Sequence, residues 1–422
     1  WYESTLAMPP PPPVVLDGAP TLTSRDQQKA ERDVVACFKS FLASGDRPTD
    51  ETKGIRLDRE CHSSWLQRGL LSLPANFAGL DASRPWFVFW ISHSLDMLGS
   101  YSESMWMPKA ASFLAQCQDP CGGFGGGPGQ LPHLAPTYAA VSALMIAGSE
   151  VAYSVVDRCK TYEFLLRMKD ADGGFRMHDE GEMDMRGTYC AMAVASMLQI
   201  LTDELAEGVP EYVRRCQTWE GGIAGEEGLE AHGGYSYCGL AAVCILGKAD
   251  ALNLYALLDW AARKQMATEG GFCGRANKLV DSCYSFWQGA IFPLIQEALR
   301  QQGQKSSLLP DSHLWFSPQP LQTYVFLACQ HQGGGLRDKP GKSSDFYHTC
   351  YSLSGVACSQ RCSSTGELCV VGDPANELRP IDIFYNILLE KSERKCAYFD
   401  ALPFEYEGRI CGAEGRGVVE AR

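Results

Sequence analysis

Three residues in the second half of the chain carry side chains that bind transition metals. Asp281 and Cys283 are two positions apart, and His348 follows 65 residues after Cys283. They offer an oxygen, a sulfur and a nitrogen ligand, a mixed set that zinc accepts, and three protein ligands leave a fourth position for water or substrate. Because residues i and i+2 do not share a helix face, both can bind one ion only from an irregular turn or a helix start. The spacing allows a catalytic zinc site, beside the simpler alternatives of a helix N-cap, a buried thiol and an interior histidine.

Cationic residues lie near this set in the sequence. Arg275 and Lys278 precede Asp281 in the densest polar loop of the chain. His232 and Asp281 each lie ten residues past a Gly-Gly pair, so they occupy equivalent places in neighbouring units. Clustered cations in an acidic protein indicate a bound anion, and an arginine fork with a lysine point charge suits phosphate oxygens. Solvated loop charges are the alternative explanation.

A set of aromatic residues recurs at positions that face inward if the surrounding segments are helical. Its members are Trp86, Trp90, Tyr138, Tyr189, Tyr235, Tyr237, Trp287 and Tyr351. Aromatic residues at helical spacing are usually part of a packed core. A polar rim with anion donors above an aromatic cavity would also fit an amphiphilic ligand with an anionic head and an apolar tail.

The elements that must position these residues form five similar units. A Gly-Gly pair followed by a bulky apolar residue recurs five times, and the second glycines are Gly123, Gly174, Gly222, Gly271 and Gly335. Successive second glycines are 51, 48, 49 and 64 positions apart. Each unit is rich in Ala, Leu, Cys and Met rather than in β-branched residues, which favours helices over strands. A period near 50 residues is typical of stacked or closed helical hairpins. We predict an all-α fold, although the spacing alone does not distinguish an open solenoid from a closed ring.

Individual helices follow from the same pattern. The apolar spacing over 26–42 predicts a first amphipathic helix. After each of the first four glycine pairs, a small-residue-rich apolar stretch predicts an inner helix, over Tyr138–Ala147, Tyr189–Leu198, Tyr237–Leu246 and Ser285–Leu294. Small residues there would let neighbouring inner helices pack closely.

Composition excludes several classes of protein. The chain has 422 residues, which on length alone would suggest two or three domains, but the repeated turns favour one. The net charge of −13 argues against a sequence-independent grip on nucleic acid or on an anionic membrane. The 18 cysteines include no Cys-x-x-Cys pair, which argues against a zinc ribbon or thioredoxin-like site. With no signal-peptide pattern and no apolar stretch of membrane-spanning length, we expect a cytoplasmic protein that is not an integral membrane protein.

Several longer motifs, in a fixed order along the chain, point to a known family. They are Cys-Gly-Gly-Phe-Gly-Gly-Gly-Pro (121–128), Trp-Glu-Gly-Gly-Ile (219–223), Glu-Ala-His-Gly-Gly-Tyr (230–235), Asn-Lys-Leu-Val-Asp-Ser-Cys-Tyr-Ser-Phe-Trp (277–287), Lys-Pro-Gly-Lys (339–342) and Asp-Phe-Tyr-His-Thr-Cys-Tyr (345–351). Between about Ser83 and Gly355 these motifs resemble the β subunits of protein farnesyltransferases, in the protein prenyltransferase β-subunit family.

The resemblance implies an α–α toroid, a closed ring of inner and outer helices whose central funnel binds farnesyl diphosphate. It implies transfer of the farnesyl group to the cysteine thiol of a C-terminal CaaX sequence, by a heterodimer with an α subunit. Zn²⁺ would be held by Asp281, Cys283 and His348, and Mg²⁺ would assist diphosphate departure near Asp338. The diphosphate would be bound by His232, Arg275, Lys278 and Tyr284.

The resemblance also assigns the two organic substrates. Residues that would line the isoprenoid are Trp86, Tyr138, Arg186, Tyr189, Tyr235, Cys238 and Trp287. Residues that would contact the CaaX peptide are Ser83, Trp86, Trp90, His133, Ala135, Pro136 and Tyr347. The alternative within the family is the β subunit of geranylgeranyltransferase type I. The bulk of Trp86 and Tyr138 at the funnel floor would exclude the twenty-carbon tail of a geranylgeranyl substrate, which favours farnesyl transfer.

Two departures from the family pattern limit these assignments. Ser282 stands where the family would have glycine, a change that is tolerable if its φ is negative. The Pro-rich start and the segments 358–378 and 401–422 match no motif of the family, and we expect them to be extensions or insertions. The chain is expected to divide into a Pro-rich tail (1–25), a toroid (26–390) with a possible insertion (358–378), and a C-terminal extension (391–422).

Proteins of other classes use similar toroids but carry different motifs. The Asp-x-Asp-Asp sequence of terpene cyclases and the Gly-Cys-Gly-Glu-Gln sequence of thioester proteins are both absent from the chain.

Overall fold

A computed structural model describes residues 21–43, 54–101, 103–303, 315–361, 368–406 and 409–410. Most of the predicted Pro-rich tail and part of the predicted insertion lie outside these residues. The first helix, α2 (Leu22–Ala43), contains the predicted helix 26–42. None of the helices in the described part of the chain combines the length and the apolar character needed to cross a bilayer.

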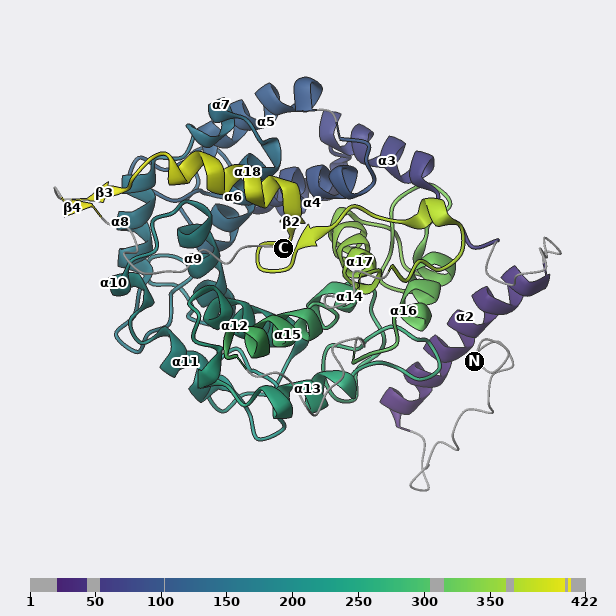
Figure 1. Cartoon of the computed structure of the whole chain (residues 1–422). Helices are drawn as coiled ribbons and strands as arrows, with labels where there is room; N and C mark the ends of the chain where they lie inside the picture. Colours follow the sequence, from purple (N-terminus) through teal and green to yellow (C-terminus); the bar gives the residue numbers. More distant parts are fainter. Residues whose placement is uncertain are drawn as a thin grey trace.

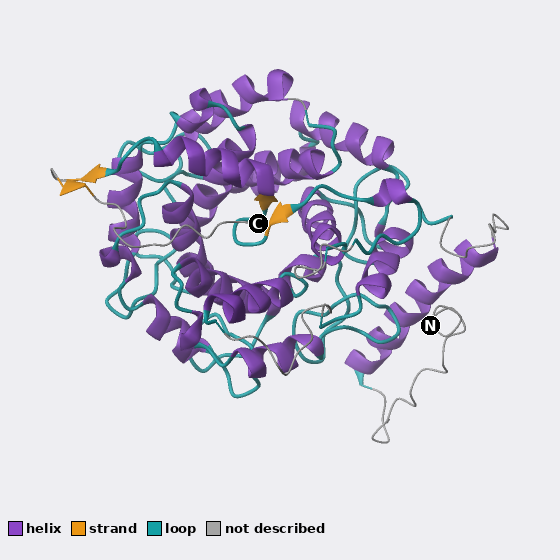
Figure 2. Ribbon diagram, viewed as in Figure 1, coloured by secondary structure: helices purple, strands orange, loops and turns teal. Residues whose placement is uncertain are grey.

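The helices form two concentric rings (Figures 1 and 2). The inner ring consists of α4 (Arg84–Met97), α6 (Leu134–Ala147), α9 (Met185–Met197), α12 (Gly233–Ile245), the pair α14 (Tyr284–Trp287) and α15 (Ile291–Gln301), and α17 (Phe346–Ser359). The outer ring consists of α3 (Arg59–Leu71), α5 (Glu103–Cys117), α8 (Arg158–Met168), α11 (Val209–Cys216), α13 (Leu254–Ala262) and α16 (Pro318–Tyr324). Neighbouring inner helices contact one another in chain order, and α17 returns to pack against α4. The all-α toroid is confirmed, and the open solenoid is excluded.

Short elements connect the hairpins. They are the 3₁₀ helices η1 (Ala75–Ser83), η2 (Ala249–Ala251) and η4 (Pro374–Asn376), the π-helical turn η3 (Val325–Cys329), and the one-turn helices α7 (Glu150–Tyr153) and α10 (Asp203–Ala206).

Burial explains which helices are inner. Nearly every residue of α6, α9 and α12 is buried, because these helices are apolar or small on all sides. The outer helix α8 instead buries a stripe, Thr161, Tyr162, Phe164, Leu165 and Met168, and leaves its other face to solvent. The small residues of the inner helices therefore allow the close packing that the sequence predicted.

The Gly-Gly turn of each unit packs closely against the next unit of the ring. The first glycine of each pair has a positive φ, between 83° and 105°, a conformation that favours glycine. A Cβ on Gly122 would lie 1.8 Å from the carbonyl oxygen of Lys160 in the following outer helix, and one on Gly221 would lie 2.2 Å from that of Ala256. In the fifth turn, a Cβ on Gly334 would lie 2.4 Å from the side chain of Trp65 in α3. The last turn thus meets the first outer helix, which closes the ring.

The inner helix of the fourth Gly-Gly unit is interrupted, whereas a continuous helix was predicted over Ser285–Leu294. Helix α14 ends at Trp287, residues 288–290 form a turn, and α15 begins at Ile291. Pro293 has no N–H to donate to the carbonyl of residue 289, which favours its place in the first turn of a new helix. The prediction of one helix was wrong at this point because it took no account of this proline.

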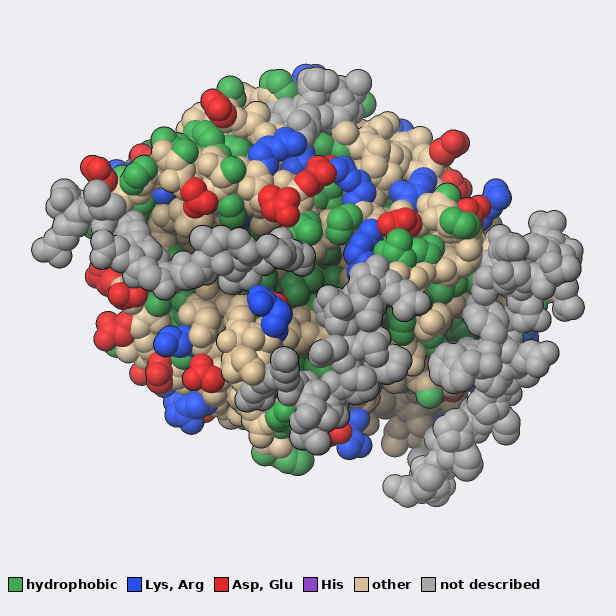
Figure 3. Space-filling model, viewed as in Figure 1, with side chains coloured by type: hydrophobic (Ala, Val, Ile, Leu, Met, Phe, Trp, Pro, Cys, Tyr) green, Lys and Arg blue, Asp and Glu red, His purple; other side chains and the backbone are tan. Residues whose placement is uncertain are grey.

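The C-terminal part of the described chain closes one end of the ring. Strands β1 (Ile381–Asp382) and β2 (Ile387–Leu388) form a hairpin, and α18 (Leu389–Asp400) packs beside α6 and α9. The tip of the hairpin accepts hydrogen bonds from three inner-ring tyrosines, from Tyr138 to the Tyr385 carbonyl (2.8 Å), from Tyr189 to Phe384 (2.9 Å) and from Tyr237 to Ile383 (2.9 Å). On this face the centre of the ring is hollowed, with hydrophobic side chains inside it (Figure 3).

The predicted domain boundary at residue 390 falls within α18. A second short pair, β3 (Glu405–Tyr406) and β4 (Arg409–Ile410), follows this helix.

Candidate functional site

The tenth residue after each second glycine caps an inner helix or the turn that leads into one. The side chains of His133, Asp184, His232, Asp281 and Asp345 each accept a hydrogen bond from a backbone N–H two or three residues further on, at 2.8–3.1 Å. These caps satisfy N–H groups that a helix start leaves unpaired. The predicted equivalence of His232 and Asp281 is confirmed, and the repeat extends to all five units.

The predicted metal-binding side chains meet at this end of the ring. One ligand atom from each of Asp281, Cys283 and His348 lies within 4.8 Å of the other two, and His348 Nε2 is 3.3 Å from Asp281 Oδ1. Asp281 and Cys283 belong to a turn directly before α14, whereas His348 is in the first turn of α17. The fold thus provides the irregular helix start that two ligands at i and i+2 require.

Electrostatics in the metal-free chain distinguish the three groups. Burial, together with the charge of Asp281, raises the pKa of Cys283 well above its usual value. Burial opposes the charged form of His348, but hydrogen bonds to Asp281 and Asp345 outweigh it and raise the His348 pKa to about 10. Burial likewise opposes the charge of Asp281, yet the bond to His348 lowers the Asp281 pKa. The carboxylate of Asp281 and the imidazole of His348 therefore favour their charged forms, whereas the Cys283 thiol favours its neutral form.

Asp345 has a position that we did not predict as functional. Its Oδ2 lies 2.6 Å from His348 Nδ1, while its Oδ1 accepts the His348 backbone N–H at 2.8 Å. A carboxylate that holds one ring nitrogen leaves the other nitrogen of the histidine directed at the metal position. The signal in the sequence was the equivalence of Asp345 with Asp281, ten residues after the second glycine.

Ser282 occupies its place without strain. It is not among the described non-glycine residues with positive φ, which confirms that serine can replace glycine here. Its N–H donates to the Asp338 carbonyl (3.0 Å) and its hydroxyl donates to the Arg337 carbonyl (2.9 Å). The two bonds fix the metal-binding turn to the loop that carries Asp338.

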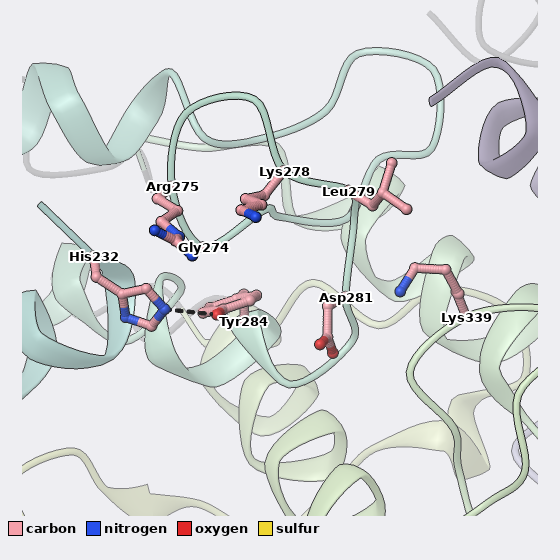
Figure 4. Close-up of a pocket in the computed structure, with 8 residues that line it drawn as sticks. All are labelled: His232, Gly274, Arg275, Lys278, Leu279, Asp281, Tyr284 and Lys339. Carbon is pink, nitrogen blue, oxygen red and sulfur yellow. Dashed lines mark hydrogen bonds between the residues drawn. The ribbon is translucent and has the colours of Figure 1, made fainter. Parts of the chain in front are cut away.

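A pocket of about 330 Å³ lies beside the metal-binding cluster. Figure 4 shows its lining residues, which are His232, Gly274, Arg275, Lys278, Leu279, Asp281, Tyr284 and Lys339. All four residues predicted to bind the diphosphate therefore line this pocket. Asp281 belongs both to the pocket lining and to the metal-binding cluster. Gly274, Leu279 and Lys339 also line the pocket but were not predicted as site residues.

Within the pocket, the protonation of His232 can be inferred from its bonds. Burial and the charge of Arg275 lower the pKa of His232, so the ring is neutral at neutral pH. Its Nδ1 accepts from the Gly234 N–H, so the hydrogen is on Nε2, which lies 2.9 Å from the Tyr284 hydroxyl. Tyr284 accepts this bond, and its own O–H is left to donate to a bound anion.

Two carboxylates flank the cations. Arg275 Nη1 is 2.7 Å from Glu230 Oε2, and Lys339 contacts Asp338. Burial and the charge of Asp281 raise the pKa of Asp338, and the contact with Lys339 counteracts that shift. A nearby cation therefore stabilises the ionised form of Asp338.

The predicted aromatic residues form a closed circuit of ring contacts inside the inner ring. Successive ring centroids are 5.7 Å apart for Trp86 and Tyr138, 5.4 Å for Tyr138 and Tyr189, 5.3 Å for Tyr189 and Tyr237, 5.3 Å for Tyr237 and Trp287, 4.4 Å for Trp287 and Tyr351, 4.9 Å for Tyr351 and Tyr347, 5.6 Å for Tyr347 and Trp90, and 5.4 Å for Trp90 and Trp86. Tyr235 lies apart from this circuit, beside His232 at the polar end.

The remaining predicted residues lie at the same end of the inner helices. Ser83 directly precedes α4, and the Arg84 N–H donates to the Gly126 carbonyl (3.0 Å), which brings α4 to the loop before His133. His133 is followed in the first turn of α6 by Ala135 and Pro136, and its ring is 5.4 Å from that of His178. Arg186 is paired with Asp184 at 2.5 Å, and Cys238 is buried in α12.

Comparison with known proteins identifies the class of this toroid. The family model named prenyltransferase alpha-alpha toroid domain matches residues 57–387. The chain is therefore a prenyltransferase toroid.

Relatives narrow the class to one subunit type. The chain is 40% identical over 435 residues to the protein farnesyltransferase subunit beta of Arabidopsis thaliana, with 90% of each chain covered. It is 41% identical over 376 residues to that of Pisum sativum, covering 76% of this chain and 90% of the relative. The chain belongs to the protein farnesyltransferase β-subunit family. Its fold is similar to that of Candida albicans protein geranylgeranyltransferase-I complexed with GGPP, with a TM-score of 0.64, 18% identity, and coverage of 81% and 98% of the two chains.

Proposed function

We propose that this chain is the catalytic β subunit of a zinc-dependent protein farnesyltransferase. Its substrates would be farnesyl diphosphate and proteins that end in a CaaX sequence, and its partner would be an α subunit, as the names of its relatives imply. The observation that carries the proposal is the adjacency of three sites: a mixed-ligand cluster, a cationic pocket that shares Asp281 with it, and an aromatic circuit. Such a cytoplasmic enzyme would need no membrane-spanning segment.

The cluster fits zinc by its donor set and surroundings. One carboxylate, one thiol and one imidazole converge within 4.8 Å, which is the number of protein ligands in a catalytic zinc site. Asp345 already holds the second nitrogen of His348, as an outer-shell partner of a zinc-bound histidine does. Zinc bound here would lower the pKa of a substrate thiol, so that it is a thiolate near neutral pH.

The residues of the chain would carry out the rest of the reaction. The aromatic circuit would bind the farnesyl tail and exclude water. Tyr138, Tyr189 and Tyr237, which donate hydrogen bonds to the C-terminal hairpin, would form the floor of the funnel. Arg275, Lys278 and the Tyr284 hydroxyl would stabilise the charge that builds on the departing diphosphate, with His232 orienting Tyr284. Asp338 would hold Mg²⁺ beside that diphosphate. Since the substrate thiolate is the nucleophile, no side-chain general base is needed.

The direct test is prenyl transfer by the purified chain with its α subunit. We expect tritiated farnesyl diphosphate to label the cysteine of a CaaX peptide, with one zinc per heterodimer by mass spectrometry. Preferential use of geranylgeranyl diphosphate would instead identify a geranylgeranyltransferase type I subunit. Absence of transfer from either diphosphate, with zinc present, would contradict the proposed function.

Replacing Asp345 with asparagine should weaken zinc binding by about 10- to 100-fold, the usual effect of losing an outer-shell partner. Asparagine is also a good N-cap, so the start of α17 should persist. The measurement is zinc affinity in a competition with a fluorescent chelator. The matched control is Asp184→Asn, which changes the equivalent cap of the second unit, and equal losses in both variants would contradict the role of Asp345.

A further inference from the structure

We propose that Lys339, at the edge of the cationic pocket, is a further diphosphate-binding residue, and that Asp338 is its counter-ion before the diphosphate binds. This inference rests on the proposed function, because it adds a residue to the site that would hold the diphosphate. Like Arg275, which pairs with Glu230, Lys339 already has a carboxylate partner inside the site.

The position of Lys339 supports a direct contact. Its side chain lines the same pocket as His232, Arg275 and Lys278, but it comes from a different unit of the ring. Figure 4 shows its amine directed into the pocket, on the side of Asp281, opposite the loop that carries Arg275. An anion in the pocket would therefore lie between cations from both sides.

The local backbone holds this lysine in place. The preceding residue, Asp338, accepts hydrogen bonds on its carbonyl from the Ser282 N–H (3.0 Å) and the Tyr324 hydroxyl (2.8 Å). The side chain of Lys339 is only 14% exposed. Lys342, three residues further along the same loop, is exposed and is not part of the pocket lining.

The ion pair with Asp338 determines whether a substitution at either residue should strengthen or weaken diphosphate binding. The Lys339 ammonium has three N–H donors and contacts one carboxylate oxygen of Asp338, so donors remain for a phosphate oxygen. The negative charge of Asp338, however, offsets part of the positive charge that Lys339 presents to an anion. A divalent cation bound by Asp338 would replace Lys339 as its counter-ion and would free the lysine for the diphosphate.

The test measures binding of inorganic pyrophosphate to the complete heterodimer by calorimetry, in buffer free of Mg²⁺. Lys339→Ala should weaken binding by about 10-fold or more, the effect of one lost charge-assisted hydrogen bond. Lys339→Arg should restore most of that affinity, and Lys342→Ala should leave it unchanged. Asp338→Asn should strengthen binding, and that gain should shrink when Lys339 is already alanine.

The outcomes separate this inference from the function beneath it. If Lys278→Ala loses pyrophosphate while Lys339→Ala binds it as tightly as the unaltered chain, the role of Lys339 is wrong and the proposed function stands. An equal loss in Lys339→Ala and Lys339→Arg would also overturn it, because it would indicate a structural effect. If the unaltered heterodimer binds neither pyrophosphate nor farnesyl diphosphate, the proposed function itself fails.

Discussion

Replacing Cys283 with alanine should remove the bound zinc and reduce farnesyl transfer by about 10³-fold or more, because a metal supplies several kcal/mol of transition-state stabilisation. Cys283 is the softest of the three ligands, and the residue is 3% exposed. With two ligands left, we expect a fall in zinc affinity beyond the 10- to 100-fold typical of an outer-shell loss. Zinc content and single-turnover transfer should be measured on the same preparation.

The control for this prediction is another buried cysteine. Cys244 is also 3% exposed and lies in α12, but it is not part of the metal-binding cluster. Cys244→Ala should retain zinc and transfer, apart from a modest loss of thermal stability. A Cys283→Ala protein that keeps full turnover without zinc would refute the metal-based assignment.

Opening the aromatic floor should change which prenyl diphosphate is used. We expect Trp86→Thr combined with Tyr138→Ala to raise the kcat/KM for geranylgeranyl diphosphate relative to farnesyl diphosphate. The fourth isoprene unit adds five carbons, and burial of about 0.8 kcal/mol for each would give a preference change approaching 10³-fold as an upper bound. Trp86 and Tyr138 are adjacent in the circuit, with centroids 5.7 Å apart, so their removal creates one continuous space.

Tyr138 also holds the hairpin that closes the ring, so its two roles need separate variants. Tyr138→Phe keeps the ring but removes the hydrogen bond to the Tyr385 carbonyl. We expect this variant to be less stable in thermal unfolding, because a buried carbonyl loses a partner, and to keep its preference for farnesyl diphosphate. If the double truncation does not increase use of the longer substrate, the floor does not measure chain length.

Much of the fold could be predicted because its period is local. The five Gly-Gly pairs, and the aromatic residue 15 or 16 positions after each second glycine, mark the inner helices that follow them, but α4 has no such pair before it. The same period placed His232 and Asp281 in equivalent caps. The prediction was wrong where Pro293 broke the pattern between α14 and α15. It also placed the starts of three inner helices at Tyr138, Tyr189 and Tyr237, whereas α6, α9 and α12 begin at Leu134, Met185 and Gly233.

The sequence by itself determined the repeated hairpin, the ligand types and the family, because these depend on residue identity and on spacing within a unit. Only the tertiary structure decided that the ring closes through Gly334 and Trp65 and that Glu230 pairs with Arg275. It also decided that the tip of the C-terminal hairpin meets Tyr138, Tyr189 and Tyr237. These contacts join residues of different units, and a spacing along the chain does not encode the curvature that brings one unit against another.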